Sequence, residues 1–397
     1  MDFSFSPQEE QFRQELRDWL ARNLPAGWLE GQRSLPEDEQ ERAIFLRNWQ
    51  RTLYEGNWAG VSWPKKYGGR GASLMEEVIY QQEMARVKAP PVLNIIGIGM
   101  IGPTLMQMGT EEQKAKYVHK ILSGEEIWCQ GYSEPNAGSD LAAIQTRAVR
   151  EKGRWVINGQ KVWTSYAHLA DRCFLLTRTD STGKKHEGIT AFLVDMHQAG
   201  VQTRPIHQMS DHRDFNEIFL TDAVAYDEDI VGQVNDGWRV SIALLMHERV
   251  GVARQVFTLQ QQFDDLVAMS KALTKKGRPL IEDPLVRARL ADFYAKTRGA
   301  LLNYYRNLTQ TMKRGVPGPE GSLDKLASSE LGKEMLGYAV SLQGPHGTLW
   351  KEDAFVDGQW QDGYMFSYGL TIAGGTTEIQ KNIVAERILG LPKDIKS

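Results

Sequence analysis

The sequence predicts an α+β fold in which a helical domain, a strand-rich domain and a second helical domain follow one another. Three observations predict this order. Apolar residues recur at helical spacing to about residue 127, short apolar or alternating segments fill residues 128–231, and long amphipathic segments return from 232 to 397. A chain of 397 residues is long enough for two or three domains with sizeable cores. We therefore expect domains at 1–127, 128–231 and 232–397.

The first helix is predicted by a capping box. Glu9 follows Ser6 by three residues, and Pro7 takes the first helical position, a combination typical of a helix N-terminus. Three further helices are expected in this domain, over Ala43–Glu55, Leu74–Arg86 and Thr110–Leu122. A group of helix-breaking residues interrupts the apolar stretch before the last of these and is expected to allow close packing: Gly97, Gly99, Gly102 and Pro103.

A turn-rich connector separates the second and third of these helices. It reads VSWPKKYGGRGAS and spans Val61–Ser73. Its glycines lack the full G-x-G-x-x-G spacing, and no predicted strand precedes them. We therefore interpret this segment as a structural connector and reject a nucleotide-binding loop.

The central domain is predicted from alternation and turn residues. Residues 146–166 alternate apolar and polar side chains, and Asn158-Gly159 is expected to form the turn of a hairpin. Further strands are expected at 173–179, 188–196, 201–208 and 216–226. Several short strands at close spacing favour a small barrel or sandwich.

The last domain returns to helical periodicity. One long amphipathic helix is expected over Gly237–Phe263, followed by a break at 271–284 that contains four basic residues and is interpreted as a solvated loop. Helices resume over Leu285–Thr311 and Leu323–Leu342, and Gln343–Gly347 is expected to be a turn. A Gly-Gly turn and a threonine cap then begin a terminal helix.

Composition excludes several classes of protein. The net charge of −3 argues against a nucleic-acid binder, which needs a basic surface. Cys129 and Cys173 are too few for a disulfide framework and indicate a reducing compartment. No apolar run reaches transmembrane length, and the N-terminus lacks the basic region of a targeting signal, so we expect a cytoplasmic protein. His207 and His212 lie near acidic residues but match no metal-binding spacing, and no metal site is expected.

Turn-forming residues crowd the stretch after Trp128, which reads WCQGYSEPNAGSDLAA. Ser, Asn and Asp side chains bond their own backbone here, and Gly138 allows a ligand to approach closely. Trp163, near the end of the following strand segment, could lie flat against an aromatic ligand. The residues alone leave two interpretations open: a surface turn before an ordinary hairpin, or a small-molecule site.

The order of these residues favours the site. SEPNAGSD, followed by a strand segment that ends NGQKVWTS, strongly resembles the flavin-binding region of acyl-CoA dehydrogenases. The ending GTTEIQ…AER…LG extends the resemblance over nearly the whole chain. The resemblance implies an N-terminal all-α domain, a middle β-barrel or sandwich and a C-terminal four-helix bundle. It also implies FAD as cofactor, held between the last two domains and reaching into a neighbouring subunit.

The resemblance implies three groups of cofactor contacts. The first group faces the flavin or the pantetheine arm of the substrate and consists of Gln130, Tyr132, Ser133, Gly138 and Ser139. Trp163 and Ser165 match positions on the flavin ring, and Thr376 and Glu378 match positions near the adenine end.

Three departures from the family pattern are visible. Tyr132 replaces a smaller aliphatic residue. Leu273 stands near the place of an arginine that meets the FAD diphosphate of the adjacent subunit, with no phenylalanine before Gly277. The family's Q-x-x-G-G-x-G loop is replaced by SLQGPHG. The last two departures concern the cross-subunit half of the FAD site.

The catalytic base is predicted by the same resemblance. The family's usual position for a glutamate base is occupied here by Gly374, whose backbone N–H is expected to polarise the thioester. A minority of the family carries the base on a C-terminal-domain helix directly before an arginine, which points to Glu248, with Arg249 and Ser139 as substrate contacts. Apolar neighbours would raise the pKa of Glu248.

The implied function is α,β-dehydrogenation of an acyl-CoA thioester to a trans-2-enoyl-CoA, as in fatty acid β-oxidation. Electrons would pass to an electron-transfer flavoprotein, and the assembly would be a homotetramer or a heterotetramer with a related subunit. Two alternatives stay open. One is an acyl-CoA oxidase, and the other is a subunit that completes a partner's FAD site without doing chemistry itself.

Overall fold

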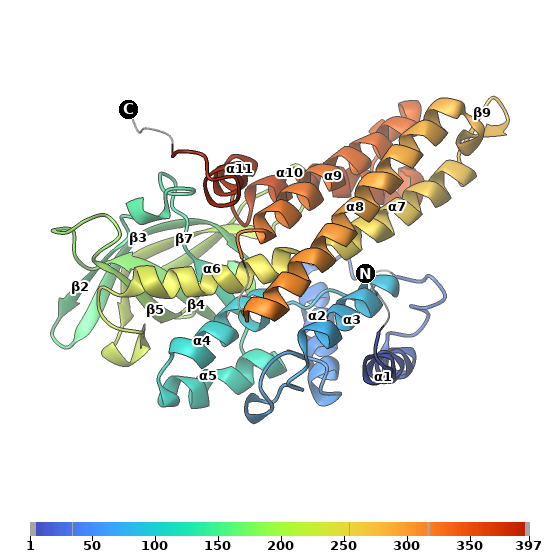
Figure 1. Ribbon diagram of the computed structural model, residues 1–397. Helices are drawn as coiled ribbons and strands as arrows, with labels where there is room; N and C mark the ends of the chain where they lie inside the picture. The colour runs from blue at the N-terminus through green and yellow to red at the C-terminus, as the bar shows by residue number, and fades with distance from the viewer. Residues whose placement is uncertain (1–4, 34, 254, 316–317, 394–397) are drawn as a thin grey trace. The chain divides into compact units, whose positions relative to one another are not determined.

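The computed structural model describes residues 5–33, 35–253, 255–315 and 318–393, with the side chains of 248–253 outside the description. The chain divides into two compact units, Met1–Glu248 and Arg249–Ser397, and each is considered by itself. Figure 1 shows the elements of both.

Five α-helices open the first unit: α1 (Pro7–Asn23), α2 (Glu39–Glu55), α3 (Leu74–Arg86), α4 (Gly102–Met108) and α5 (Glu111–Ser123). The predicted capping box of α1 is confirmed, because the Ser6 hydroxyl accepts the Glu9 N–H and the Glu9 carboxylate accepts the Ser6 N–H. The bounds predicted for α3 are those observed. Helix α2 begins four residues before the predicted Ala43, since the side chain of Asp38 caps it.

The glycine-rich stretch before α5 is helical rather than interrupted. Residues Gly97–Ile101 form a π-helical turn that continues into α4. Close packing is confirmed at two glycines. A Cβ on Gly97 would lie 2.4 Å from Asn94 Oδ1, and one on Gly102 would lie 2.3 Å from the Trp63 ring. The prediction of close packing is wrong at Gly99, because a Cβ there would meet nothing within 4 Å.

An eight-stranded sheet follows in the same unit. Its strands are β1 (Trp128–Gly131), β2 (Arg147–Glu151), β3 (Arg154–Ser165), β4 (Arg172–Arg178), β5 (Ile189–Asp195), β6 (Val201–Pro205), β7 (Phe215–Ala225) and β8 (Ile230–Val231). The order is β6-β7-β3-β2-β4-β5-β8, and β1 pairs with β4 in parallel. Cys129 and Cys173 are opposite each other in that pairing, and both are buried free thiols.

The turn of the hairpin predicted at Asn158-Gly159 lies elsewhere in the chain, so the predicted turn position is wrong. Strand β3 runs straight through both residues, and the turn lies at Lys152-Gly153, where φ is +48° and +81°. Two consecutive residues with positive φ form the tight turn that matches the twist of antiparallel strands. Gly159 instead lies at a register shift against β7, and a Cβ there would meet Thr146 at 2.6–2.8 Å.

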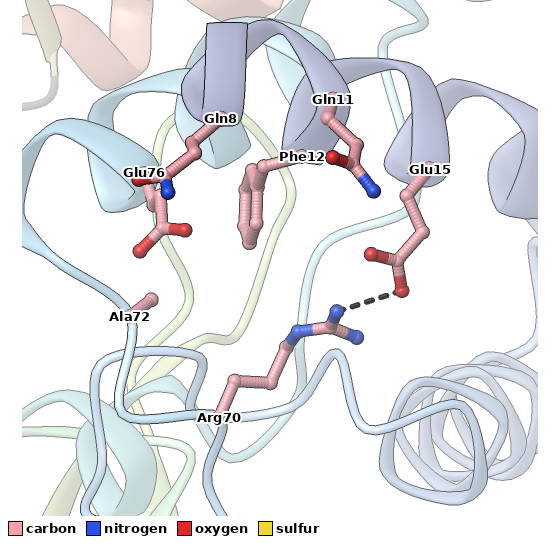
Figure 2. Close-up of a pocket in the computed structure, with 7 residues that line it drawn as sticks. All are labelled: Gln8, Gln11, Phe12, Glu15, Arg70, Ala72 and Glu76. Atoms are coloured by element: carbon pink, nitrogen blue, oxygen red, sulfur yellow. Dashed lines mark hydrogen bonds and ion pairs between the residues drawn. The ribbon is translucent and has the colours of Figure 1, made fainter. Parts of the chain in front are cut away.

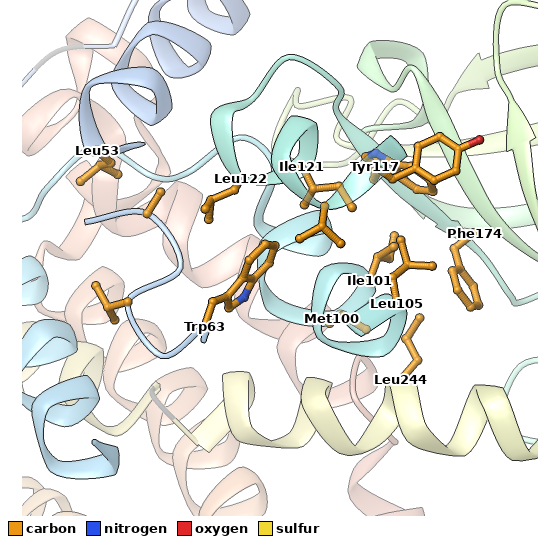
Figure 3. Close-up of a cluster of buried hydrophobic side chains, with 14 of the residues drawn as sticks. Leu53, Trp63, Met100, Ile101, Leu105, Tyr117, Ile121, Leu122, Phe174 and Leu244 are labelled. Carbon is orange, nitrogen blue, oxygen red and sulfur yellow. The ribbon is translucent and has the colours of Figure 1, made fainter. Parts of the chain in front are cut away.

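Helices and strands of the first unit share one apolar core. Figure 3 shows side chains of α2, α4, α5, β4 and α6 (Gly237–Ala253) in this cluster, among them Leu53, Leu105, Ile121, Phe174 and Leu244. Each of these five is almost completely buried. These shared buried side chains hold the helices against the sheet.

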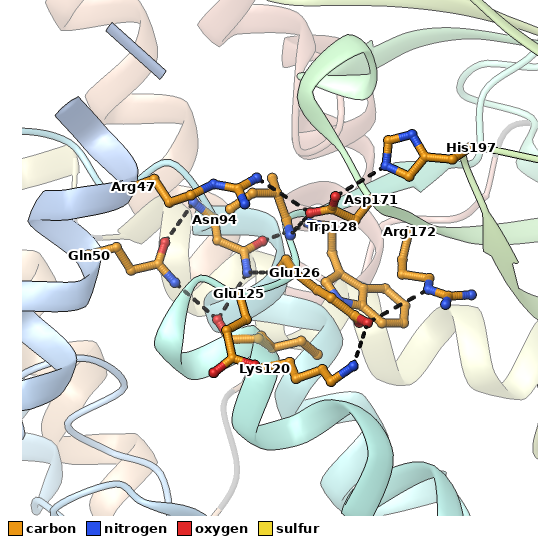
Figure 4. A network of polar contacts seen from close by, with 12 residues as sticks. Arg47, Gln50, Asn94, Lys120, Glu125, Glu126, Trp128, Asp171, Arg172 and His197 are labelled. Atoms are coloured by element: carbon orange, nitrogen blue, oxygen red, sulfur yellow. Dashed lines mark hydrogen bonds and ion pairs between the residues drawn. The ribbon is translucent and has the colours of Figure 1, made fainter. Parts of the chain in front are cut away.

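Buried amides fix the start of β1 (Figure 4). Asn94 Oδ1 accepts the Trp128 N–H at 2.9 Å, while its Nδ2 donates to the carbonyl oxygens of Ile121 at 3.0 Å and Glu126 at 2.9 Å. The Asp171 carboxylate accepts the Ile127 N–H at 2.8 Å. The strand that leads into the predicted site is therefore anchored at its first residue.

Four helices of the second unit pack as a bundle: α7 (Gln255–Ala272), α8 (Pro284–Arg314), α9 (Gly321–Leu342) and α10 (Gln359–Ile372). Its core contains side chains from all four, among them Phe263, Phe293, Met335 and Trp360. The break at 271–284 includes a two-stranded hairpin, β9 (Thr274–Lys275) and β10 (Arg278–Pro279). Helix α10 was not predicted, and α11 (Thr377–Ile383) begins at the predicted Thr376 cap. None of the described helices is long and apolar enough to cross a bilayer.

Candidate functional site

The predicted flavin loop begins directly after β1. Gln130 and Ser133 are half-buried, Tyr132 is buried against Phe174 with ring centroids 6.4 Å apart, and Gly138 and Ser139 are exposed. Glu134 and Ala137 exchange two backbone hydrogen bonds of 3.0 Å, which closes a tight turn between them. The loop is therefore an ordered turn whose far end is open to solvent.

Two carboxylates of this loop, those of Glu134 and Asp140, have different contacts. The Glu134 carboxylate accepts the N–H groups of Gln145 at 2.6 Å and Thr146 at 2.9 Å, as expected of a capping residue. The side chain of Asp140 caps no helix and instead pairs with Lys185 at 2.8 Å.

Sequence reasoning gave no role to Lys161, which lies beneath this loop. Its ammonium is completely buried, pairs with the Glu134 carboxylate at 2.7 Å and donates to the Tyr132 carbonyl oxygen at 3.1 Å. Burial alone would raise the pKa of Glu134, but Lys161 and the backbone N–H donors lower it, so Glu134 stays ionised. A lysine in an otherwise apolar face of a predicted strand was the signal that could have identified it.

Trp163 is turned out of the sheet by a β-bulge. In the pairing of β3 with β7, Lys161 is opposite Ile218 and Thr164 is opposite Asn216, so β3 carries one extra residue. Trp163 takes a left-handed φ of +61° there, and its side chain is 60% exposed. The ring of Phe215 packs at 79° to the indole, with 6.3 Å between the ring centroids. The backbone thus presents a large aromatic surface to solvent.

Two hydroxyl side chains follow the exposed indole. Ser165 is half-buried at the end of β3. Thr164 is buried, and its Oγ1 has no hydrogen-bond partner among the residues that the structure describes. A ligand or a water could satisfy such a buried hydroxyl. Thr164 was also missed as a candidate.

These features fit the isoalloxazine ring of a flavin. The ring is flat and apolar on its faces, and polar along its edges. The exposed indole of Trp163 supplies a stacking surface, while Gln130, Ser133 and Ser165 supply polar groups that are only partly buried. All of these residues lie in the first unit.

The predicted adenine-end residues lie in the second unit. Gly374 and Gly375 have φ of +67° and +93°, and the Gly374 carbonyl oxygen accepts from Gln380 Nε2 at 2.7 Å. The Thr376 hydroxyl accepts the Ile379 N–H at 3.2 Å and so caps α11. Glu378 is exposed in the first turn, where a backbone hydrogen bond and the Thr376 hydroxyl lower its pKa.

The predicted base lies on α6. Glu248 and Arg249 are part of this helix, but their side chains lie outside the described residues. Leu244, four residues earlier, is completely buried, and Leu245 is half-buried. The predicted roles of Glu248 and Arg249 stay predictions.

The two segments expected at the cross-subunit half of the FAD site are ordered turns. Leu273 follows α7, and Lys276 and Gly277 form the hairpin turn between β9 and β10 with φ of +52° and +77°. Gln343 is buried, and its Oε1 accepts from Gln361 Nε2 at 3.1 Å. A 3-10 helix over Gly344–Thr348 takes the place of the predicted turn.

Two other features are separate from these residues. A pocket of about 240 Å³ lies on the helical part of the first unit, and the Arg70 guanidinium pairs with the Glu15 carboxylate in its wall (Figure 2), with 2.7 Å between the two polar atoms. Amide and carboxylate side chains line it together with Phe12, Arg70 and Ala72, and none of the predicted site residues does. His207 pairs with Asp211 at 2.7 Å on the surface, and the described part of the chain holds no group of three residues suited to a metal.

Comparison with known proteins places the chain in a family. The acyl-CoA dehydrogenase N-terminal, middle and C-terminal domains match residues 6–125, 129–223 and 235–389. The "Acyl-CoA dehydrogenase IpdE1" of Mycolicibacterium smegmatis is 39% identical over 98% of this chain and 99% of its own length.

Two solved structures share the fold. The ChsE4-ChsE5 complex from Mycobacterium tuberculosis superposes with a TM-score of 0.86 at 30% identity, over 99% of this chain and 100% of the matched one. The Tcur3481-Tcur3483 steroid ACAD gives the same values.

This chain belongs to the acyl-CoA dehydrogenase family, which consists of flavin-dependent oxidoreductases. The three-part fold expected from the sequence is confirmed, and FAD is the cofactor.

Proposed function

We propose that this enzyme removes a proton and a hydride from adjacent carbons of an acyl-CoA thioester and releases a trans-2-enoyl-CoA. The single observation that carries the proposal is the exposed indole of Trp163 beside the ordered Tyr132–Gly138 loop, in a chain of this family. FAD, when bound, supplies the hydride acceptor. The protein must supply a base and must polarise the thioester oxygen.

We propose Glu248 as the base and the backbone N–H of Gly374 as the donor to the thioester oxygen. Gly374 has no side chain that could take a proton, while Glu248 follows the buried Leu244 by one helical turn. Apolar surroundings would raise the pKa of a carboxyl group toward the working pH. Ser139, exposed at the open end of the loop, and Arg249 are proposed to contact the substrate.

The proposed base is tested with Glu248→Gln. We expect the variant to keep its fold and FAD, and to lower turnover by about 10²- to 10⁴-fold, as is typical when a general base is lost. Rapid mixing with acyl-CoA under anaerobic conditions, followed by flavin bleaching, measures the reductive step. Bleaching at the parental rate with saturating substrate would show that Glu248 is not the base.

We propose a bulky, steroid-derived acyl group as the substrate class. The support is the likeness to a steroid ACAD over nearly the whole chain. Flavin bleaching with a panel of straight-chain, branched and steroid-derived acyl-CoAs tests this, and fastest bleaching by a straight-chain substrate would refute it. Re-oxidation of the reduced enzyme by electron-transfer flavoprotein, compared with oxygen, tests the proposed acceptor.

We propose that the enzyme assembles with a related subunit. We also propose that it acts in the cytoplasm, and that its functional domains span residues 1–127, 128–231 and 232–397. Support for a mixed assembly comes from the departures at Leu273 and SLQGPHG and from the likeness to the ChsE4-ChsE5 complex. These departures also favour a second candidate role, as the subunit that completes a partner's FAD site. FAD bound by the chain alone, with turnover, would argue against that second role.

A further inference from the structure

Lys161 is a buried cation at the junction of two parts of the predicted flavin site. Its side chain is 0% exposed and that of Glu134 is 8% exposed. Burying two charges is expensive, and an apolar pair of similar volume is often as stable or more stable. Stability is therefore a poor explanation for a lysine at this position, and its contacts suggest another.

The contacts of the pair tie one end of the loop to the sheet. Lys161 Nζ binds the Tyr132 carbonyl oxygen, and Glu134 binds Lys161 together with the N–H groups of Gln145 and Thr146. Because Thr146 leads directly into β2, this arrangement fixes both the start and the return of the loop.

The same stretch of β3 continues into the bulge. Val162, next to Lys161, donates its N–H to the Ser133 carbonyl oxygen at 2.9 Å, and the next residue is the outward-facing Trp163. Two consecutive residues of β3 thus hold the loop backbone, and the third carries the indole. The spacing between loop and indole follows from this short connection.

We propose that Lys161 and Glu134 are positioning residues for FAD, which set the spacing between the Tyr132–Gly138 loop and the Trp163 indole. They act through the carbonyl oxygen of Tyr132 and the backbone N–H groups of Gln145 and Thr146. This inference rests on the flavin half-site described above. If the loop and the indole already have the spacing that FAD requires, less conformational entropy is lost when the cofactor binds.

The test is FAD affinity, measured by titrating apoprotein with FAD and following the quenching of flavin fluorescence. Glu134→Gln and Lys161→Met are expected to raise the FAD dissociation constant by about 10- to 100-fold, by analogy with the loss of metal affinity when residues that orient metal ligands are removed. The double variant Lys161→Met/Glu134→Gln is expected to lose less than the product of the two single effects, because the residues act as a unit.

The matched control is Glu83→Gln. Glu83 is also a buried carboxylate with cationic partners, but it joins α1 to α3 and is not part of the sheet. We expect this variant to lower the melting temperature of the apoprotein and to leave the FAD dissociation constant within about twofold of the parent, since distant sites add independently. A purely structural role for Lys161 and Glu134 would make them behave like Glu83.

The outcomes distinguish the proposed flavin site from the positioning role of Lys161 and Glu134. A parent that binds no FAD, alone or in its assembly, refutes the proposed flavin site itself. A parent that binds FAD, with Glu134→Gln and Lys161→Met binding it equally well, overturns the positioning role alone. If a single variant does not fold, the double variant decides, because it leaves no unpaired buried charge. Parental FAD affinity in the folded double variant would overturn the inference.

Discussion

Trp163 is held outward by its own backbone conformation, because a left-handed φ at a bulge reverses the side to which the residue points. We predict that Trp163→Ala weakens FAD binding by roughly 2- to 10-fold through loss of stacking worth about 0.5–1.5 kcal/mol. Titration of apoprotein with FAD measures the effect. Trp163→Phe retains an aromatic face and should bind more tightly than Trp163→Ala. Equal affinity of all three proteins would place the indole outside the flavin site.

Single residues also mark the limit of what the sequence could predict about the site. The loop and Trp163 could be identified from turn residues and the family pattern. The contacts of Lys161 could not be predicted, because they join segments that are far apart in the chain, and no sequence signal marked the hydroxyl of Thr164, which has no partner among the described residues. An ion pair between Lys161 and Glu134 requires the register of β3 against the loop, and local spacing does not determine that register.

At the level of elements, the pairing of strands decides where glycine is required. Gly159 has a φ of +153°, and a Cβ there would meet the backbone Cα of Thr146 at 2.7 Å. We predict that Gly159→Ala lowers the free energy of unfolding by about 1–3 kcal/mol, through overpacking and backbone strain. Urea denaturation of the apoprotein measures it.

Gly299→Ala is the control, and it is expected to raise the free energy of unfolding. Gly299 lies inside α8, and a Cβ there would meet nothing within 4 Å. Alanine in a helix interior is expected to stabilise by about 0.5–1 kcal/mol. A Gly159→Ala variant as stable as the parent would contradict the close approach of β3 to Thr146.

Glu83 is the polar link between α1 and α3. Its carboxylate is 2% exposed and accepts hydrogen bonds from Arg13, Arg17 and Arg86. Burial alone would raise the pKa of Glu83, but the three arginines reverse the shift and lower it. A lowered pKa in the folded state contributes stability that is present above the unfolded pKa of about 4.3 and is lost as the pH falls through the folded value.

We therefore predict that Glu83→Gln lowers the free energy of unfolding at pH 7 by up to about 3 kcal/mol, and that the difference from the parent shrinks on acidification below about pH 4. Melting curves from pH 3 to pH 7 measure it. Glu111→Gln is the control, since the Glu111 carboxylate is exposed and an ion pair made by an exposed carboxylate contributes little to stability. A difference that is constant with pH would contradict the ion-pair explanation.

The sequence predicted elements well where the signal is local, and less well where it is tertiary. The Ser6–Glu9 capping box and the bounds Leu74–Arg86 depend on a few neighbouring residues, and both are confirmed. The turn at Asn158-Gly159 was wrong, because an Asn-Gly pair also suits a register shift, and the partner strand β7 decides between the two. Lys152-Gly153, the actual turn, has the weaker local signal.

At the level of the whole molecule, large apolar side chains remain exposed along the second unit. On α8, Leu285 is 80% exposed, Met312 57%, Tyr294 53% and Leu302 46%. Several large apolar side chains are uncommon on a helix surface that faces only solvent. We predict that the chain is not a monomer, and that light scattering gives a mass well above 44.9 kDa.

Leu302→Glu places a charge on this surface and should shift the mass toward the monomer, since a buried unpaired charge opposes association. Ile44→Glu is the matched control, because Ile44 is 61% exposed on α2 in the first unit and should leave the mass unchanged. Full FAD content and turnover at 44.9 kDa would refute an assembly-dependent enzyme, and an unchanged mass in Leu302→Glu would place the interface away from this part of α8.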